Sequence, residues 1–483
     1  MSTSAKVTAR QRIENLLDDN SFVEIGAYVK ARNTDFNIQA KDTPSDGVIT
    51  GYGVINGGLV YVYSQDASVL GGSVGEMHAK KIASLYDMAM KTGSPVIGLI
   101  DSTGLRLQES VDGLNAFGQI YMKQSLASGA IPTVTAIFGN CGGGLSIVAG
   151  LSDFTFMEVE NAQLFVNSPN AITENRKEIC DNASAKFQSE EAGNVDFVGT
   201  EAEVIEGIRN LVSVLPSNNE DEASDLECYD DLNRAAEGIE NCGEDTLLAL
   251  ENISDDGFII EAKRNYAPEM VTAFIKLNGA TVGAVANRTK VYDDDMNVAA
   301  EFDAKLTAKG CNKAAEFVNF CDAFNIPVLT LTNVNGFAAT MCQEKNGAKA
   351  SSKLVYAFAN ATVPKVNLII GDAIGSAYVT MNSKATGADI VYAWPTAKVG
   401  MMEAKSAVEI MYADEIANGD ANQVINEKVA EYQNLQGSVM AAAARGYVDS
   451  IVEPIDTRKY LIGAFEMLYT KFEERPGKKH GTV

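Results

Sequence analysis

Two glycine-rich loops contain the groups of this chain that are best suited to chemistry. Residues 139–144 read GNCGGG and residues 371–377 read GDAIGSA, and each loop follows an apolar run and precedes a helical segment. The start of a helix presents unpaired backbone N–H groups and the positive end of its dipole, and glycine lets a ligand approach that backbone closely. Two such N–H groups directed at one oxygen would form an oxyanion hole, which stabilises an enolate without a titrating side chain. Close packing of a helix on a strand also requires glycine, and the spacing alone leaves both interpretations open.

Side-chain catalysis has few candidates in this sequence. Only two histidines occur, His78 and His480, which excludes a histidine-rich metal site and makes any Ser-His-Asp triad depend on His78. His78 precedes Lys80 and Lys81 in a helical segment, so we expect a structural or surface histidine. Contact of these lysines with ligand phosphates is the less favoured role. The P-loop and dinucleotide-binding patterns are absent, and we predict no metal site.

The elements that must position the two loops occur twice, 232 residues apart. The pairs that share this separation are Pro95 and Pro327, Gly104 and Gly336, Pro132 and Pro364, Gly139 and Gly371, and Gly143 and Gly375. In each half, short β-rich runs alternate with helical segments, of which 77–90 and 314–324 are the clearest. This pattern predicts two similar α/β domains, each with the order helix, strand, glycine loop, helix, strand, glycine loop, helix.

An acidic stretch separates the halves. Residues 216–225 are acidic and nearly free of apolar side chains, which is typical of a solvated linker. We place this linker at about 214–240, with a first domain over 1–240 and a second over 241–483. The openings of the two domains are also similar, since 18–24 reads DDNSFVE and 255–261 reads DDGFIIE.

Composition narrows the class of protein. The 483 residues carry 39 Lys plus Arg against 64 Asp plus Glu, a formal charge of −25, which argues against general nucleic-acid binding. Apolar residues make up 46% of the chain, yet no run is long enough to cross a membrane, and the N-terminus lacks the apolar core of a signal peptide. The seven cysteines form no Cys-x-x-Cys pair. We expect a cytoplasmic protein with reduced thiols.

Several segments together resemble one enzyme family, the acyl-CoA carboxyltransferases. These are the β-type subunits of biotin-dependent carboxylases, transcarboxylases and decarboxylases. The segments are 48–57 (VITGYGVING), 71–81 (GGSVGEMHAKK), 361–366 (ATVPKV), 392–397 (YAWPTA) and 444–449 (ARGYVD). The resemblance spans nearly the whole chain and is weaker over about 170–240 and 400–440.

The resemblance implies tandem crotonase-like domains and a set of site residues. In the family, the first domain holds the thioester oxygen of an acyl-CoA and the second holds the ureido oxygen of biotin. The implied catalytic donors are Gly143 and Gly144 in the first domain and Ser376 and Ala377 in the second. The implied substrate-binding positions are Gly104, Gly142, Gly336, Gly375 and Val379, of which Val379 matches a position that tunes the choice of acyl chain.

The resemblance also implies a reaction and its partners. A carboxyl group would move between N1 of biotin and the α-carbon of an acyl-CoA. The favoured substrate is a propionyl- or methylmalonyl-CoA-like thioester. Biotin would arrive on a separate carrier protein, served by a biotin carboxylase or a membrane decarboxylase subunit. The subunits would form a hexamer, with each active site between the first domain of one subunit and the second domain of its partner, or a hetero-oligomer with a paralogue.

Three segments depart from the family pattern and keep other functions open. The family's DSGGAR is DSTGLR at 101–106, its PGF is NGF at 335–337, and its Gly-Ala is Gly144-Leu145. These changes suggest an unusual acyl group, or a non-catalytic or regulatory paralogue that pairs with an active subunit. The α subunit of a sodium-pumping decarboxylase is a further alternative. A crotonase-type hydration or isomerisation would need a carboxylate base, for which Glu109 is the candidate.

Overall fold

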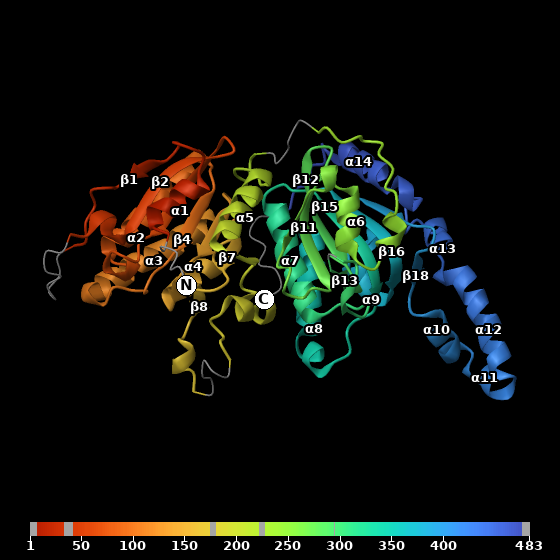
Figure 1. Cartoon of the computed structure of the whole chain (residues 1–483). Helices are drawn as coiled ribbons and strands as arrows, with labels where there is room; N and C mark the ends of the chain where they lie inside the picture. The colour runs from red at the N-terminus through yellow and green to blue at the C-terminus, as the bar shows by residue number, and fades with distance from the viewer. Residues whose placement is uncertain (1–6, 33–41, 174–179, 222–227, 294, 476–483) are drawn as a thin grey trace. The chain divides into compact units, whose positions relative to one another are not determined.

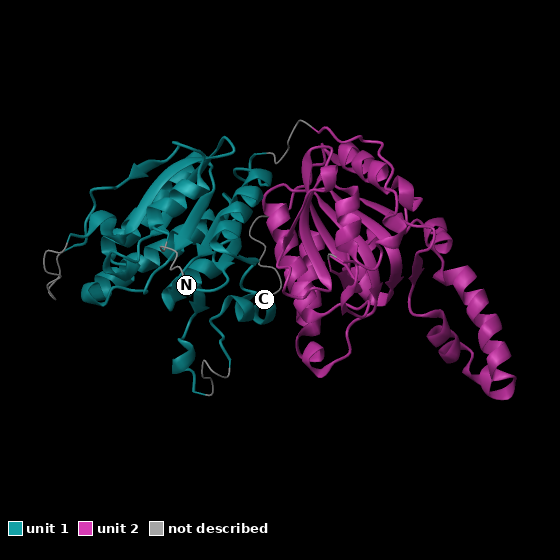
Figure 2. Ribbon diagram, in the orientation of Figure 1, with its two compact units in different colours: residues 1–223 teal, residues 224–483 magenta. Residues whose placement is uncertain are grey.

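The computed structural model describes residues 7–32, 42–173, 180–221, 228–293 and 295–475. The chain divides into two compact units, residues 1–223 and 224–483 (Figure 2). This division falls inside the acidic segment, before the boundary that the sequence placed near residue 240. Ala236 and Ile239 are buried in the core of the second unit, so the last part of the expected linker is packed structure.

The first unit is built on a seven-stranded sheet. In spatial order its strands are β1 (Val23–Ile25), β2 (Val48–Ile55), β3 (Gly58–Gln65), β4 (Val96–Ile100), β5 (Thr133–Ile137), β7 (Phe154–Glu158) and β9 (Phe197–Gly199). The first three strands are antiparallel and the rest are parallel to β3. The parallel strands β4 and β5 are buried along their whole length, as strands covered on both faces must be.

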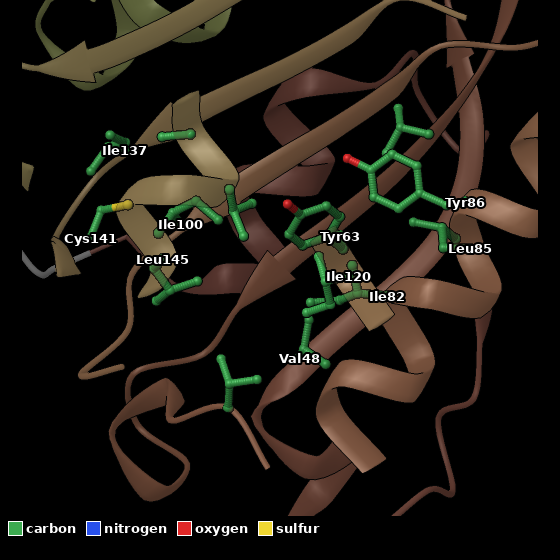
Figure 3. Close-up of a cluster of buried hydrophobic side chains, with 14 of the residues drawn as sticks. Val48, Tyr63, Ile82, Leu85, Tyr86, Ile100, Ile120, Ile137, Cys141 and Leu145 are labelled. Atoms are coloured by element: carbon green, nitrogen blue, oxygen red, sulfur yellow. The ribbon is translucent and has the colours of Figure 1, made fainter. Parts of the chain in front are cut away.

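Helices connect and cover these strands. They are α1 (Ala9–Leu16), α2 (Glu76–Thr92), α3 (Ser110–Ala127), α4 (Gly144–Gly150) and α5 (Glu201–Val214). Thr8 and Thr200 begin α1 and α5 with capping boxes, and Gly93 ends α2 in the left-handed conformation. Figure 3 shows the core, in which Cys141 and Leu145 from the glycine loop pack with side chains of the sheet and of α2 and α3. The loop is therefore anchored by its own apolar residues.

The second unit repeats this plan in an eight-stranded sheet. Its main path is β10 (Ile259–Ala262), β11 (Met270–Leu277), β12 (Ala280–Asn287), β15 (Val328–Asn335), β16 (Lys365–Ile374), β17 (Ile390–Ala393) and β19 (Ser450–Ile451), with β18 (Lys398–Gly400) paired to β16. Its helices include α6 (Thr246–Ile253), α7 (Ala308–Ala323), α8 (Met341–Asn360), α9 (Gly375–Thr380) and α14 (Thr457–Leu468). Thr307 and Thr340 cap the N-termini of α7 and α8.

The predicted duplication is confirmed in three dimensions. The strands β4 and β15 begin 232 residues apart, at Val96 and Val328, and so do β5 and β16, at Thr133 and Lys365. The helical segments expected at 77–90 and 314–324 correspond to α2 and α7. Each half therefore has an antiparallel pair followed by parallel strands with crossover helices, which is the expected tandem α/β fold.

The remaining elements lie outside the repeat. Two short pairings occur, β6 (Asn140–Gly142) with β8 (Gln163–Phe165) and β13 (Lys290–Tyr292) with β14 (Val298–Glu301). In the second unit, α10 (Ala404–Met411), α11 (Ala413–Asn418) and α12 (Ala421–Tyr432) extend away from the sheet, and α13 (Val439–Ala444) leads back to it (Figure 1). Within the described residues, no helix combines the length and the apolar character needed to cross a bilayer.

Candidate active site

The structure brings two glycine loops of the first unit together at the carboxyl ends of β4 and β5. Gly104 follows β4 with a φ of 96°, and a methyl group built on it would lie 3.8 Å from the carbonyl oxygen of Gly142. The Gly104 carbonyl accepts a hydrogen bond from the N–H of Val74 at 2.8 Å. Its own N–H donates to Ser102 Oγ at 3.1 Å. Gly104 thus shapes the loop and has a partner for both of its backbone groups.

Gly143 does not have the free N–H that the resemblance implies. Its N–H donates to the carbonyl oxygen of Phe165 at 2.9 Å, which continues the pairing of β6 with β8. Its backbone lies at φ 61° and ψ −127°, a combination open to glycine and strained for other residues. The expectation that Gly143 donates to a thioester oxygen is therefore corrected. Gly143 sets the direction of the chain into α4, and the donors must come from the residues after it.

Gly144 has the properties expected of a donor. It is exposed and is the first residue of α4, so its N–H has no acceptor within the helix. A methyl group on Gly144 would lie 2.7 Å from the Tyr121 hydroxyl and 3.0 Å from the Phe117 ring. Tyr121 also donates to the Gly144 carbonyl at 2.7 Å. Both interpretations of the glycine thus apply here, because α3 packs closely on the residue and its N–H has no hydrogen-bond acceptor among the residues that the structure describes.

The second unit presents the same arrangement of two glycines at the ends of neighbouring strands. The register of β15 and β16 pairs Asn335 with Ile374, which places Gly336 beside Gly375. Both glycines have positive φ, 88° and 70°, as Gly104 and Gly143 do at the equivalent positions. Open space surrounds the position of a methyl group on Gly336, so a ligand can approach this backbone.

The first turn of α9 carries the predicted donors of the second unit. The N–H groups of Gly375, Ser376 and Ala377 precede the first intrahelical hydrogen bond. Ser376 and Val379 are exposed on one face of the helix, whereas Ala377 is buried. The structure thus places the Ser376 N–H and the Val379 side chain next to the same solvent-facing surface.

Glu109 is part of a buried ion-pair network. Arg106 Nη1 lies 2.6 Å from Asp46 Oδ1 and 2.8 Å from Glu109 Oε1, and all three side chains are buried. The other oxygen of Glu109 accepts the N–H of Glu76 at 2.5 Å. Burial raises the pKa of Asp46, and the charge of Arg106 opposes that shift. With both oxygens engaged, Glu109 is a structural group and not a base open to substrate.

His78 is structural, as the sequence indicated. The ring is fully buried, with Nδ1 3.0 Å from the Asp46 carbonyl oxygen and Nε2 3.2 Å from Gln65 Nε2. Neutral histidine with its proton on Nδ1 satisfies both contacts. Burial lowers the pKa of His78 to about 3. His480, the other histidine, lies outside the described residues.

The lysines near His78 also bind to other groups of the same chain. Lys80 forms an ion pair with Glu76 at 2.6 Å. Lys81 is buried and donates to the carbonyl oxygens of Ser45, at 3.0 Å, and Val48, at 2.5 Å. Burial lowers the pKa of Lys81 to about 8. Contact with ligand phosphates was the less favoured role, and these bonds give no support to it.

One motif escaped the sequence reasoning. Residues 71–75 read GGSVG, which matches the Gly-x-Ser-x-Gly pattern of a nucleophile elbow. Ser73 is buried, its hydroxyl donates to the Leu70 carbonyl at 2.7 Å, and it accepts from Arg106 Nε at 3.2 Å. The serine therefore contacts the Arg106 network, and none of the hydrogen-bond partners of its hydroxyl in the described part of the chain is a histidine or a carboxylate. No cluster of three or more potential metal ligands occurs among the residues that the structure describes.

Comparison with known proteins gives a consistent result across the whole chain. A family model described as the carboxyl transferase domain matches residues 2–483. The methylmalonyl-CoA decarboxylase α subunit of Propionigenium modestum is 39% identical, over 99% of this chain and 93% of that protein. The propionyl-CoA carboxylase β chain of Roseobacter denitrificans is 38% identical, over 99% and 94%.

A solved structure agrees with these relatives. The transcarboxylase 12S hexamer, with hydrolysed methylmalonyl-coenzyme A bound, superposes with a TM-score of 0.90 at 37% identity. The superposition covers 98% of this chain and 92% of that one. By sequence, extent and fold, the chain belongs to the carboxyl transferase domain family.

Proposed function

We propose that this chain is the carboxyltransferase subunit of a biotin-dependent enzyme. It moves a carboxyl group between biotin on a separate carrier protein and the α-carbon of an acyl-CoA. The observation that carries the proposal is the repeated loop, in which Gly104 and Gly336, and Gly143 and Gly375, keep a positive φ at equivalent strand ends in two units. A propionyl- or methylmalonyl-CoA-type thioester is the favoured substrate, because the relatives are named for these compounds.

The backbone supplies the electrostatic part of the reaction. Removal of the α-proton places negative charge on the thioester oxygen, and the N–H of Gly144, with its neighbours in the first turn of α4, would donate to that oxygen. In the second unit, the N–H groups of Ser376 and Ala377 would hold the ureido carbonyl oxygen of biotin. Bound biotin supplies the carboxyl group and the nitrogen that takes the α-proton. Because these donors are uncharged and fixed by the fold, they need no reorganisation as charge develops.

The side chains fit a mechanism in which the backbone stabilises charge and biotin takes the proton. A mechanism in which the cofactor nitrogen takes the proton needs no catalytic histidine or carboxylate. His78 is neutral and buried, and Glu109 is bound to Arg106. The hydration or isomerisation alternative loses the base on which it depended. A methyl group built on Gly336 or on Gly143 would meet no neighbouring atom of the described residues within 4 Å, so a ligand could approach the backbone at both glycines.

We further propose that six copies assemble and that each active site combines units from two chains. The transcarboxylase 12S structure is described as a hexamer. A biotinylated carrier and either a biotin carboxylase or a membrane decarboxylase subunit complete the enzyme, which we place in the cytoplasm. The decarboxylase arrangement is the second candidate, favoured by the 39% identity to the α subunit of methylmalonyl-CoA decarboxylase.

A carboxyl-exchange assay tests the proposed function. Purified chain is mixed with malonyl-, methylmalonyl- or glutaconyl-CoA and with free biotin or a biotinylated carrier. We expect conversion of methylmalonyl-CoA to propionyl-CoA that depends on biotin. Absence of exchange with every thioester would overturn the proposal. Exchange that appears only when a second carboxyltransferase subunit is added would show a paralogue that needs an active partner.

A further inference from the structure

The side chain of Asn333, near the end of β15, takes the place of a backbone hydrogen bond that is missing between β15 and β16. The pairing of β15 with β16 is interrupted between Thr332 and Val334, where the register shifts from Ile369 to Ala373. Asn333 lies at this interruption, and its Oδ1 accepts the N–H of Asp372 at 3.0 Å. The amide side chain thus satisfies a backbone donor in a bulge of β16, two residues before the strand ends at Ile374.

The neighbouring glycine is explained by the same side chain. A methyl group on Gly371 would lie 2.5 Å from Asn333 Oδ1, so only glycine leaves room for the amide. The bulge in β16, the Asn333 side chain and Gly371 together determine how β16 turns into α9. The donors at Ser376 and Ala377 follow directly.

The first unit has a similar close contact between a polar side chain and a glycine at the equivalent positions. Asp101 and Gly139 lie 232 residues before Asn333 and Gly371, and a methyl group on Gly139 would overlap the Asp101 carboxylate. Asp101 is buried, and its carboxylate lies 3.4 Å from Nη1 of Arg12. Nε of the same arginine forms an ion pair with Glu201 at 2.8 Å. The charged carboxylate is therefore accompanied by a buried cation. In the second unit the side chain against the glycine is a neutral amide, which needs no counter-charge.

We propose that Asn333 is a positioning residue for the backbone donors of α9. It acts through the N–H of Asp372 and touches no reacting atom. Loss of the acceptor would leave that N–H unpaired and allow the end of β16 to shift, and displacement of a catalytic group by about 1 Å can cost on the order of 100-fold in rate. This inference rests on the proposed function, because it concerns the donors assigned to biotin.

The test compares three variants in the exchange assay with methylmalonyl-CoA and free biotin. Asn333→Ala removes the acceptor, Asn333→Asp retains it, and Asn333→Leu is a second loss variant of similar size. Asp322→Ala is the matched control, because Asp322 Oδ1 accepts the N–H of Thr362 at 2.6 Å, just before β16 begins. Each protein is measured for kcat, for KM of the thioester and for melting temperature.

We expect Asn333→Ala and Asn333→Leu to lower kcat by about 10-fold or more with little change in KM of the thioester, and Asn333→Asp to restore most of the rate. Asp322→Ala should lower the melting temperature and keep kcat. The inference is overturned if both loss variants keep the wild-type kcat, if Asp322→Ala loses as much, or if Asn333→Asp gives no rescue. An inactive wild-type enzyme would instead refute the proposed function, and the inference would fall with it.

Discussion

At the scale of single residues, Gly143 shows how similar glycines take different roles. The sequence identified the loop and the resemblance named Gly143 and Gly144 as the donor pair. Within the described residues, the Gly144 N–H has no acceptor, whereas the Gly143 N–H is bonded to the Phe165 carbonyl. The partner strand β8 has three residues and no periodicity, so no sequence signal announces this bond. Asn333 was overlooked although the 232-residue repeat, which pairs it with Asp101, was a signal that could have found it.

Gly143→Ala tests whether the backbone conformation at this residue matters. Apart from the adjoining residues, no atom of the described chain lies within 4 Å of the added methyl group, so the cost is conformational rather than steric. We expect a loss of about 1–3 kcal/mol in the free energy of unfolding, together with reduced exchange. Gly118→Ala is the control, since Gly118 lies exposed within α3 with equal space around it, and it should gain about 0.5–1 kcal/mol. Equal urea denaturation curves for the two variants would refute the conformational role.

His78 predicts a pH dependence of stability. The folded pKa of His78 is about 3, below its ordinary value of 6.5. Between these values the unfolded chain binds a proton that the folded chain excludes, so stability falls as the pH drops below about 6.5. Relative to His78→Gln, the wild-type protein should lose about 2 kcal/mol more between pH 7 and pH 5. Identical losses in the two proteins, measured by urea denaturation, would contradict the buried neutral ring.

At the scale of elements, periodicity predicted what is regular and missed what is irregular. The helices α2 and α7 and the strands β4, β5, β15 and β16 follow from apolar patterns and from the repeat. The bulge in β16 depends on a side chain from the neighbouring strand, which no local pattern encodes. The domain boundary was placed too late in the chain. The acidic composition around 228–240 indicated a linker, yet Ala236 and Ile239 in this segment are buried in the core.

The Arg106 network joins several elements of the first unit and should be sensitive to loss of its cation. Arg106 also donates to the Ser73 carbonyl at 2.6 Å. Arg106→Met would leave Asp46 and Glu109 buried without a counter-charge, and we expect a loss of about 3–5 kcal/mol in the free energy of unfolding. Glu109→Gln keeps the Arg106–Asp46 pair, so it should cost less and should leave exchange active. Loss of an enoyl-CoA hydratase activity in Glu109→Gln would revive the base assignment.

At the scale of the whole molecule, one fold occurs twice, and the two copies differ at the predicted sites. Both units place a positive-φ glycine at the junction of a strand and a short helix. In the first unit, however, the Gly143 N–H is bonded to Phe165, and Asp101 lies beside Arg12. The family relationship covers the full length of the described chain. The division of ligands between the units, acyl-CoA in the first and biotin in the second, remains a prediction.

The assembly is testable without substrate. Light scattering of the purified chain should give the mass of six copies, as expected for an active site shared between chains and for similarity to a hexameric transcarboxylase. A monomer with full exchange activity would show that one chain completes its own site and would contradict the shared arrangement.

The most direct test of backbone catalysis is a pair of substitutions at Ser376. Ser376→Ala removes the hydroxyl and keeps the N–H, whereas Ser376→Pro removes the N–H at a first-turn position where a helix tolerates proline. We predict that Ser376→Ala exchanges carboxyl groups at nearly the wild-type rate and that Ser376→Pro loses about 100-fold or more in kcat with an unchanged melting temperature. Equal rates in the two variants would contradict the assignment of main-chain donors at the start of α9.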